Sequence, residues 1–278
     1  MPPPPMPQAP KLPIEGVKNL VAVASGKGGV GKTTVAVNLA LALDRMGASV
    51  GLLDADVYGP NVPIMLGTEE QPQALSEREI LPVEVQGLKI ISMGLLNPGD
   101  KPMIWRGPML HSVMNQFLRS VVWGKLDYLI VDLPPGTGDV QLSLIQIVPV
   151  TGAVLVTTPS VVALADVRKA MEMFRQVNVD ILGIVENMSY FSCPHCQEKI
   201  DVFGHDEGRR IAQTYGVPLL GEIEIDPRIR IGGDTGKPVA LLGESAPEAK
   251  SIYAMARAVA ARLDAKAAAG GGAVVEID

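Results

Sequence analysis

The sequence predicts an α/β fold in which a doubly wound, mostly parallel sheet is flanked by helices within a single domain. Short apolar runs rich in Val, Ile and Leu alternate with helix-length segments along most of the chain. These runs are continuously apolar, which is typical of strands that are buried on both faces. Each helix returns the chain to the end of the sheet at which the previous strand began. Strands that alternate with helices therefore form a parallel sheet. At 278 residues, the chain is long enough for one large domain with a well-buried core.

The predicted elements follow one another in a regular order. Residues 1–16 are Pro-rich and predict a flexible N-terminal segment, which is followed by the main domain over residues 17–268. A helix is predicted for residues 34–46 and another for residues 247–268, each with apolar residues at helical spacing, and residues 269–278 are expected to form a flexible tail. Strands are predicted at residues 20–25, 49–54, 88–93, 127–132, 153–158 and 181–187.

Composition restricts the class of protein. Lys and Arg number 24 against 30 Asp and Glu, and this net charge of -6 argues against a nucleic-acid surface built on bulk positive charge. No apolar run reaches the roughly 18 residues of a membrane span, and the N-terminus does not have the pattern of a secretory signal. Two cysteines in one Cys-x-x-Cys suit a reducing compartment. We therefore expect a cytoplasmic protein with no nucleic-acid partner and no stable membrane association.

A phosphate-binding loop is predicted between the first strand and the first helix. Residues 26–34 read Gly-Lys-Gly-Gly-Val-Gly-Lys-Thr-Thr, which contains the P-loop pattern Gly-x-x-x-x-Gly-Lys-Thr. In this pattern backbone N–H groups surround the phosphates, Lys32 reaches the β and γ oxygens, and the Thr33 hydroxyl ligates Mg²⁺. The N-terminus of the following helix also favours an anion. The residues expected to bind nucleotide here are Gly26, Lys27, Gly28, Gly29, Val30, Gly31, Lys32, Thr33 and Thr34.

Acidic residues follow two other predicted strands at the sheet edge where ligands bind in such folds. Asp132 ends an apolar run, as does the acidic partner of a P-loop that holds Mg²⁺. Asp54 and Asp56 follow another strand, and residues two apart on an extended segment share a side, so both are candidates to face the phosphates. Capping of the following loop is the alternative, and it suits Asp54 better than Asp56. We assign Thr33, Asp54 and Asp132 to the magnesium site.

Cys193 and Cys196 form a Cys-Pro-His-Cys pair that is open to four interpretations. A thiol–disulfide oxidoreductase has a helix at its first cysteine, whereas residues 197–203 read more like a strand. Two free structural thiols are a second interpretation. A zinc ion needs four ligands, and the same stretch offers two thiolates with His195 or His205. Two such pairs that meet across a two-fold axis supply four thiolates, which suit either a [4Fe–4S] cluster or a zinc ion.

Together these motifs resemble the Mrp/ApbC branch of the deviant-Walker ATPases. The resemblance extends from residue 15 to about residue 265 and implies a P-loop NTPase whose relatives are dimeric ATPases that bind iron–sulfur clusters and pass them on. It rests on Lys27 in the loop, Asp54-Ala-Asp56-Val-Tyr-Gly-Pro-Asn, Val131-Asp132-Leu-Pro-Pro-Gly-Thr-Gly-Asp139, Glu186-Asn187-Met-Ser and Cys193-Pro-His-Cys196.

The resemblance also implies residue roles, cofactors and partners. Lys27 would cross to the nucleotide of a second subunit, where a positive charge acts as an arginine finger does, while Lys32 serves its own site. Asp56 would position the attacking water and Asn187 would contact the adenine, so that Lys27, Lys32 and Asp56 are the implied catalytic residues. The implied assembly is a homodimer with ATP, Mg²⁺ and a [4Fe–4S] cluster that bridges two subunits. The implied partners are iron–sulfur apoproteins and cluster assembly proteins, and the implied cluster ligands are Cys193 and Cys196.

Two alternatives remain at this point. A partitioning or positioning ATPase, which acts as a switch on DNA or on a membrane, shares the additional lysine of the phosphate loop. The net acidity and the cysteine pair count against it, and the predicted C-terminal helix is not a basic amphipathic one. A zinc-bridged dimeric ATPase satisfies the same ligand count as the cluster.

Overall fold

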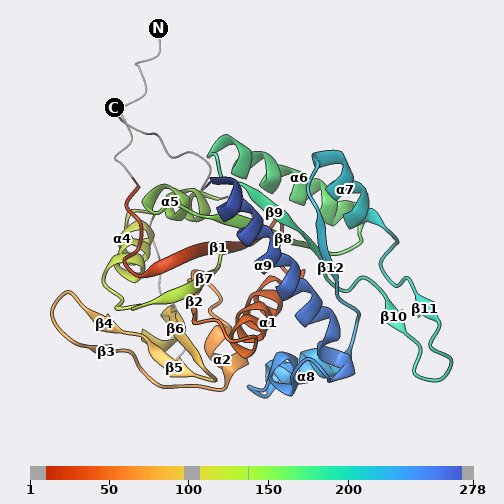
Figure 1. The fold of residues 1–278 in the computed structure, drawn as a ribbon, viewed down its shortest axis with the longest axis horizontal. Coiled ribbons are helices and arrows are strands. Elements are labelled where there is room, and N and C mark those ends of the chain that lie inside the picture. The colour runs from red at the N-terminus through yellow and green to blue at the C-terminus, as the bar shows by residue number, and fades with distance from the viewer. Residues whose placement is uncertain (1–10, 97–106, 137, 271–278) are drawn as a thin grey trace, which may run out of the picture.

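The computed structural model describes residues 11–96, 107–136 and 138–270. Within them lies an eight-stranded sheet with the order β12-β9-β8-β1-β7-β2-β6-β5 (Figure 1). Neighbouring strands are parallel except at one edge, where β5 pairs antiparallel with β6. The predicted α/β fold with a mostly parallel sheet is therefore confirmed. The first ten residues of the predicted N-terminal segment and residues 271–278 of the predicted tail lie outside the described residues.

The strands of this sheet are β1 (Val17–Ser25), β2 (Val50–Asp54), β5 (Val83–Val85), β6 (Leu88–Ser92), β7 (Leu126–Asp132), β8 (Gly152–Thr157), β9 (Ile181–Glu186) and β12 (Leu219–Glu222). The α-helices are α1 (Lys32–Arg45), α2 (Val62–Leu66), α3 (Met93–Leu96), α4 (Gly107–Arg119), α5 (Asp139–Ile147), α6 (Val161–Gln176), α7 (Glu207–Tyr215), α8 (Pro227–Asp234) and α9 (Lys250–Gly270). Two short antiparallel pairs join β3 (Gln73–Ala74) to β4 (Ile80–Leu81) and β10 (Phe191–Ser192) to β11 (Lys199–Ile200).

Helices cover both faces of the sheet, so that its central strands are buried on both sides (Figure 1). Helices α1, α8 and α9 contribute to one hydrophobic cluster, whereas α4, α5, α6 and α7 contribute to the other. The side chains of β1 alternate between the two, because Val21 and Val23 pack in the first cluster and Ala22 and Ala24 in the second. This double burial explains why the strands read as continuous apolar runs.

The six predicted strands correspond to the central part of the sheet, and the structure adds one strand at each edge. Strand β12 has only four residues, and β5 has three residues with an exposed Glu84 between two valines. Neither is long enough to stand out by apolar pattern alone, because edge strands are short and only partly covered. The predicted C-terminal helix begins at Lys250, after a 3₁₀ turn over Pro247–Ala249.

The chain before β1 contacts the domain in its described part. The guanidinium of Arg119 on α4 donates hydrogen bonds to the carbonyl oxygens of Leu12 at 2.8 Å and Pro13 at 3.0 Å. Ile14 packs against the hydrophobic cluster under α4, α5 and α6. Leu12 and Pro13 are thus bonded to α4, and the predicted boundary between a flexible segment and the domain at residue 17 stays a prediction.

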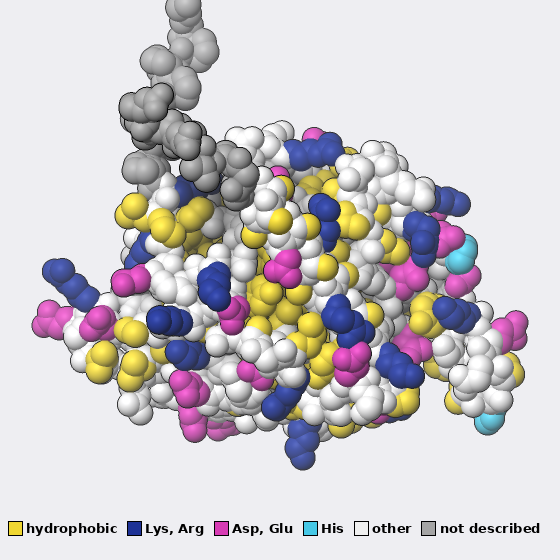
Figure 2. Space-filling model, viewed as in Figure 1, with side chains coloured by type: hydrophobic (Ala, Val, Ile, Leu, Met, Phe, Trp, Pro, Cys, Tyr) yellow, Lys and Arg dark blue, Asp and Glu magenta, His cyan; other side chains and the backbone are white. Residues whose placement is uncertain are grey.

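The surface is mixed in charge on the face that Figure 2 shows. Lys and Arg side chains lie scattered among Asp and Glu side chains there and do not gather into one patch (Figure 2).

Over residues 11–96, 107–136 and 138–270, no helix is both long enough and apolar enough to cross a membrane.

Candidate nucleotide site and cysteine hairpin

The phosphate loop connects the end of β1 to the start of α1. Gly29 and Gly31 have φ angles of 81° and 80°, in the left-handed region that favours glycine. Helix α1 begins at Lys32, so the loop runs directly into the helix N-terminus, where unpaired N–H groups and the helix dipole favour an anion. The structure therefore brings together the two features of a phosphate site that the motif predicts, namely a glycine-rich turn and a helix N-terminus.

Asn187 at the end of β9 contacts this loop from the side. Its Nδ2 donates a hydrogen bond to the Val30 carbonyl oxygen at 2.9 Å, and the side chain is only 6% exposed. A Cβ at Gly31 would lie 2.2 Å from the same nitrogen. Asn187 therefore holds the backbone of the loop, and its contact with adenine stays a prediction.

The close approach of Asn187 predicts different effects for two glycine substitutions in the loop. Gly31→Ala is expected to lower the free energy of unfolding by about 2–5 kcal/mol, from left-handed strain together with overpacking against Asn187. Gly29→Ala has the same strain but no heavy atom within 4 Å of its Cβ, so about 1–2 kcal/mol is expected. Urea unfolding of both nucleotide-free variants measures the difference. Equal losses would contradict the packing of Asn187 against Gly31.

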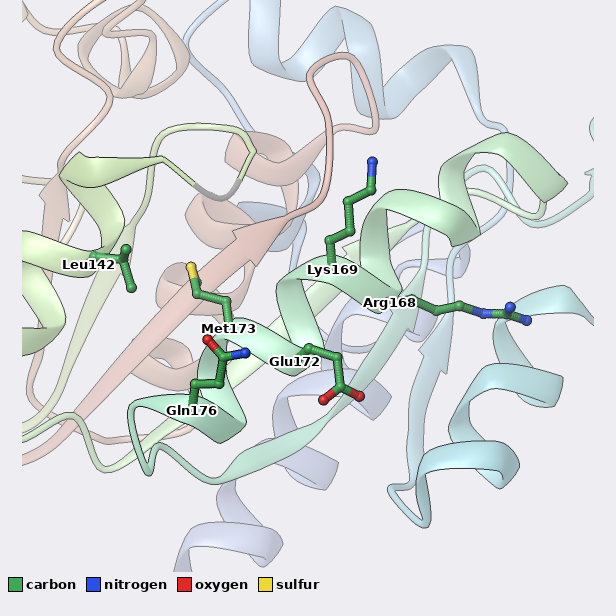
Figure 3. A pocket seen from close by; sticks show the side chains of 6 residues that line it. All are labelled: Leu142, Arg168, Lys169, Glu172, Met173 and Gln176. Carbon is green, nitrogen blue, oxygen red and sulfur yellow. The ribbon is translucent and has the colours of Figure 1, made fainter. Parts of the chain in front are cut away.

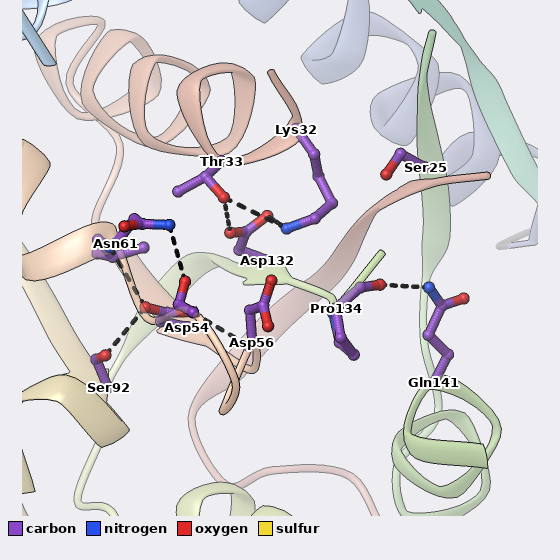
Figure 4. Close-up of polar contacts among 12 residues, drawn as sticks. Ser25, Lys32, Thr33, Asp54, Asp56, Asn61, Ser92, Asp132, Pro134 and Gln141 are labelled. Atoms are coloured by element: carbon purple, nitrogen blue, oxygen red, sulfur yellow. Dashed lines mark hydrogen bonds and ion pairs between the residues drawn. The ribbon is translucent and has the colours of Figure 1, made fainter. Parts of the chain in front are cut away.

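Asp132 at the end of β7 binds the two loop residues that are expected to act on phosphate and magnesium. The Lys32 ammonium nitrogen lies 2.6 Å from Asp132 Oδ1, and the Thr33 hydroxyl donates to Oδ2 at 2.7 Å (Figure 4). Burial raises the pKa of the Asp132 carboxyl, and the charge and hydrogen bond of Lys32 oppose that rise. The carboxylate thus lies where it can hold a metal ion beside Thr33. Its ion pair also fixes the position of the Lys32 ammonium group.

Asp54 occupies a second buried carboxylate position at the end of β2. Its oxygens accept hydrogen bonds from the Ser92 hydroxyl at 3.0 Å and from the backbone N–H groups of Asp56 at 3.1 Å and Val62 at 3.3 Å. Burial and the nearby charge of Asp132 raise the pKa of Asp54 to about 8, so its carboxyl is mainly protonated at neutral pH. These contacts are those of the loop-capping alternative, and the assignment of Asp54 to magnesium stays a prediction.

Asp56 and Lys27 are the more accessible members of the predicted set, since both are half-buried. Asp56 lies near Asp132 (Figure 4), and its charge is one of the causes that raise the pKa of the Asp132 carboxyl. The backbone carbonyl of Lys27 accepts a hydrogen bond from the Ser25 hydroxyl at 2.9 Å. Neither side chain forms a hydrogen bond or ion pair with the part of the chain that the structure describes. Their roles toward a nucleotide or a second subunit stay predictions.

A pocket of about 470 Å³ adjoins the phosphate loop. It offers room for the base and sugar of a nucleotide beside the predicted phosphate contacts. One wall comes from the segment after β12, which the sequence did not indicate as part of the site. Its lining includes Gly31, Thr33, Thr34, Asn187, Glu224 and Ile225.

The loop after β7 is held by a residue that the motifs do not reveal. The Gln141 amide on α5 donates to the Pro134 carbonyl oxygen at 2.5 Å, and the side chain is buried (Figure 4). Its Oε1 is buried without a hydrogen-bond partner among residues 11–96, 107–136 and 138–270. Gln141 lies nine residues after Asp132 in no recognisable pattern, so only the fold brings it to this loop.

A second hollow, of about 460 Å³, lies along α6 and is separate from the predicted site (Figure 3). Five of its six lining side chains come from α6, and the sixth, Leu142, comes from α5. Lys169 in this hollow pairs with Asp166 at 3.2 Å on the same helix. No residue predicted for nucleotide or metal binding lines it.

The cysteine pair lies at the turn between β10 and β11, on a hairpin that projects from the body of the protein (Figure 1). Cys193 is half-buried and Cys196 is exposed. The nearby backbone N–H groups of Cys196 and His195 and the Cys196 thiol lower the pKa of the Cys193 thiol. The second strand of the hairpin, β11, follows the pair, so the helix that an oxidoreductase needs after its first cysteine is not present at residues 197–200.

The histidines near the hairpin do not complete a metal site. The ring of His205 lies 3.2 Å from Asp201 and 2.9 Å from Asp206, measured from a ring nitrogen to a carboxylate oxygen. Among the residues that the structure describes, no group of three or more His, Cys, Asp or Glu side chains is placed to hold a metal ion. A metal at the cysteines would therefore need further ligands from outside the described residues.

Comparison with known proteins agrees with the site. Residues 16–260 match the family model described as "ParA: NUBPL iron-transfer P-loop NTPase". The chain is 52% identical over 254 residues to an iron-sulfur cluster carrier protein of Deinococcus radiodurans, covering 91% of this chain and 72% of the relative. It is 49% identical over 253 residues to the iron-sulfur cluster transfer protein NUBPL of Mus musculus, covering 90% of this chain and 79% of the relative.

Solved structures show the same architecture. A nucleotide-binding protein in complex with ADP from Archaeoglobus fulgidus is 39% identical, with a TM-score of 0.72 over 81% of this chain and 88% of that chain. The cell division ATPase MinD of Pyrococcus furiosus is 24% identical, with a TM-score of 0.65 over 87% of this chain and 98% of that chain, and it shares the fold alone. The phosphate loop, the acidic strand ends and these matches lead to one conclusion: the chain belongs to the NUBPL iron-transfer family of P-loop NTPases.

Proposed function

We propose that this protein is an ATP-hydrolysing iron–sulfur cluster carrier, which holds a [4Fe–4S] cluster between two copies of the chain and transfers it to apoproteins. The observation that carries the proposal is the projecting turn with Cys193 and Cys196, on a domain whose phosphate loop is built for a nucleotide. Relatives over nine-tenths of the chain bear the names iron-sulfur cluster carrier or transfer protein. Iron, sulfide and apoprotein are thus the cargo and the recipient.

The ligand count supports a homodimer. A [4Fe–4S] cluster takes four thiolates, and each chain has two cysteines, both on this hairpin. The lowered pKa of Cys193 favours the thiolate, which is the form that binds metal. Two hairpins related by a two-fold axis supply the complete set. Thiols with this role must stay reduced, which suits the cytoplasm.

The nucleotide half of the proposal assigns roles to residues that the fold brings together. Lys32 and Thr33 would leave Asp132 to bind the β and γ phosphates and Mg²⁺, with Asp132 on the metal side. Asp56 would orient the attacking water, and Lys27 would neutralise charge at the nucleotide of the second subunit. The pocket beside Thr34 and Asn187 would receive the base and sugar.

Anaerobic reconstitution tests the cargo. The protein is incubated with ferrous iron, sulfide and a thiol reductant, its visible spectrum is recorded, and iron, sulfide and zinc are quantified. About four iron and four sulfide per dimer are expected from the cluster formula and the ligand count. Tightly bound zinc without iron, or a full cluster on a monomer in solution, would overturn the proposal. Co-sedimentation with DNA and lipid vesicles in the presence of ATP tests the positioning-ATPase alternative, for which binding is the expected result.

A further inference from the structure

Glu186, the last residue of β9, holds both ends of the segment that carries the cysteines. Its side chain is buried, at 1% exposure. Oε1 accepts a hydrogen bond from the Ser189 hydroxyl, and Oε2 accepts one from the Gly208 backbone N–H, both at 2.6 Å. Ser189 and Gly208 flank residues 190–207, so the two ends of this segment are bonded to one carboxylate.

The contact with Gly208 is specific to a glycine. A Cβ at that position would lie 2.6 Å from Glu186 Oε2 and 3.2 Å from its Cβ and its carboxyl carbon. The carboxylate therefore occupies the space that any other side chain would need, at the N-terminal turn of α7, where negative charge is favoured. The base of the hairpin has no room to shift relative to β9 while both hydrogen bonds persist.

The next residue along the chain connects the same strand end to the phosphate loop. The Asn187 side chain donates to the Val30 carbonyl oxygen at 2.9 Å, and its backbone N–H donates to the Thr157 carbonyl oxygen on β8 at 2.8 Å. Asn187, which holds the phosphate loop, is thus the direct neighbour of Glu186, which holds the hairpin. A displacement of the loop backbone at Val30 acts directly on this strand end.

A second set of contacts joins the hairpin to the wall of the nucleotide pocket. The Ile225 N–H donates to the Tyr190 carbonyl oxygen at 2.7 Å, and the Ser192 hydroxyl donates to Glu224 Oε2 at 2.9 Å. Glu224 and Ile225 line the pocket beside the phosphate loop. The first strand of the hairpin therefore runs along the outside of the same wall that a bound nucleotide would contact on the inside.

We propose that Glu186 is a positioning residue through which the nucleotide state of the phosphate loop sets the accessibility and geometry of Cys193 and Cys196. Its meaning for cluster transfer rests on the proposed carrier function, but the coupling itself is a property of the metal-free chain. With Glu186 in place, the hairpin moves as a rigid unit together with the phosphate loop and the pocket wall. Without it, the segment loses its bond to the strand end at Gly208 and keeps only backbone and pocket-wall contacts near Ser189, Tyr190 and Ser192, so the cysteines follow the nucleotide less closely.

Thiol alkylation of the metal-free protein tests this proposal. The rates at which iodoacetamide modifies Cys193 and Cys196 are measured by mass spectrometry without nucleotide, with Mg–ADP and with a non-hydrolysable ATP analogue. The wild-type rates are expected to differ at least about fivefold between states, the lower end of typical coupling between two sites. Glu186→Ala is expected to reduce this difference clearly, because only the contacts of Tyr190 and Ser192 with the pocket wall remain, while nucleotide affinity stays nearly unchanged. Wild-type rates that ignore nucleotide, or an Ala variant that responds as the wild type does, would overturn the proposal.

Three further variants separate positioning from charge and from loss of folding. Glu186→Gln is expected to retain the coupling, because its oxygen can accept from Gly208 while its amide donates to the Ser189 hydroxyl, which also accepts. Gly208→Ala should lose the coupling with the charge intact, and it replaces Glu186→Ala if that variant does not fold. Glu222→Gln, which breaks an ion pair with Arg209 on α7 at 3.0 Å, is the matched control that should behave as the wild type.

The outcomes also distinguish this inference from the carrier function. Loss of coupling in Glu186→Gln equal to that in Glu186→Ala would show that charge and not position matters, which contradicts the proposal. If ATP protects the thiols only because it causes dimerisation, the protection would persist in Glu186→Ala. Sedimentation of the same samples measures the dimerisation. Persistent protection in the Ala variant would also contradict the proposal. If the thiols respond to nucleotide through Glu186 but no iron is bound on reconstitution, the carrier function fails while this inference stands.

Discussion

Lys32→Ala is expected to abolish nucleotide binding, whereas Lys27→Ala is expected to keep binding and lose hydrolysis. Lys32 starts α1 and is buried beside Asp132, where it would meet the phosphates of its own site. Lys27 is half-buried on the loop and has no side-chain hydrogen bond or ion pair within the described residues, so it is available to a second subunit. A cation supplied in trans to a phosphoryl transition state is worth about 10³–10⁵ in kcat. Equilibrium binding and steady-state hydrolysis measure the two effects.

Mixed dimers show whether Lys27 acts in trans. Asp56→Asn is also expected to bind ATP and hydrolyse it slowly, if Asp56 orients the water. When Lys27→Ala and Asp56→Asn chains are mixed, a lysine that acts in trans restores one of the two sites in each heterodimer. Random pairing makes about half of the dimers heterodimers, so about a quarter of wild-type activity is expected. A lysine that acts only in its own chain restores none. Lys169→Ala, which changes an exposed lysine of α6, is the matched control with unchanged activity.

The ion pair of Lys32 also predicts a pH effect on the stability of the Lys32→Ala variant. Removing the ammonium leaves the buried Asp132 carboxyl without the group that opposes the rise of its pKa. A carboxyl whose pKa is raised by folding binds more protons in the folded state, so stability falls as pH rises from its ordinary value near 4 toward the folded pKa. Lys32→Ala should therefore lose more stability between pH 5 and pH 8 than the wild type in urea unfolding. Lys32→Ala with Asp132→Asn should remove that excess.

Replacing either Cys193 or Cys196 by Ala is expected to remove the iron–sulfur cluster and its transfer while leaving ATP binding nearly intact. Each substitution takes two of the four thiolates from a two-fold dimer, because both subunits carry it. The turn lies at the end of the projecting hairpin, away from the phosphate loop in sequence. Iron per dimer should fall from about four to near zero, and an apoprotein acceptor should stay inactive in a transfer assay.

The adjacent histidine provides the control for the cysteine variants. His195→Ala lies inside the same turn and should keep the cluster, because the four cysteines already complete the ligand set. A cluster that persists in Cys193→Ala or Cys196→Ala would show that its ligands lie elsewhere. Loss of ATP binding in the cysteine variants would instead indicate that the hairpin supports the nucleotide site structurally.

The parts of the site that could be predicted from the sequence are those whose signal is local. The phosphate loop and Asp132 are recognisable because each motif is contiguous and adjoins an apolar strand. Ser92, Gln141 and Gly208 were missed, because each acts through a partner 7 to 38 residues away that only the packed fold brings near. Glu186 stood in the quoted Glu-Asn-Met-Ser run, but nothing in that run indicates a contact with α7.

The sheet itself follows the same division. The six predicted strands are those buried on both faces, where continuous Val, Ile and Leu are required. The edge strands β5 and β12 depend on pairing with β6 and β9 more than on their own residues, since each is short and partly exposed. Likewise, the resemblance implies only an adenine contact for Asn187, and the structure shows a hydrogen bond from its side chain to the loop backbone.

The convergence of Ser189 and Gly208 on one carboxylate has a consequence for how this fold can change. The two ends of this segment lie close together because both are bonded to Glu186. Lengthening such a segment adds little loop-closure free energy, since doubling a flexible loop costs only about 0.6 kcal/mol. Hairpins of other lengths, with other ligands at the turn, can therefore be inserted here while β9 and α7 keep their packing. Grafting experiments should find the turn between β10 and β11 interchangeable, provided that Glu186, Ser189 and Gly208 and the contacts of Tyr190 and Ser192 with the segment after β12 are retained.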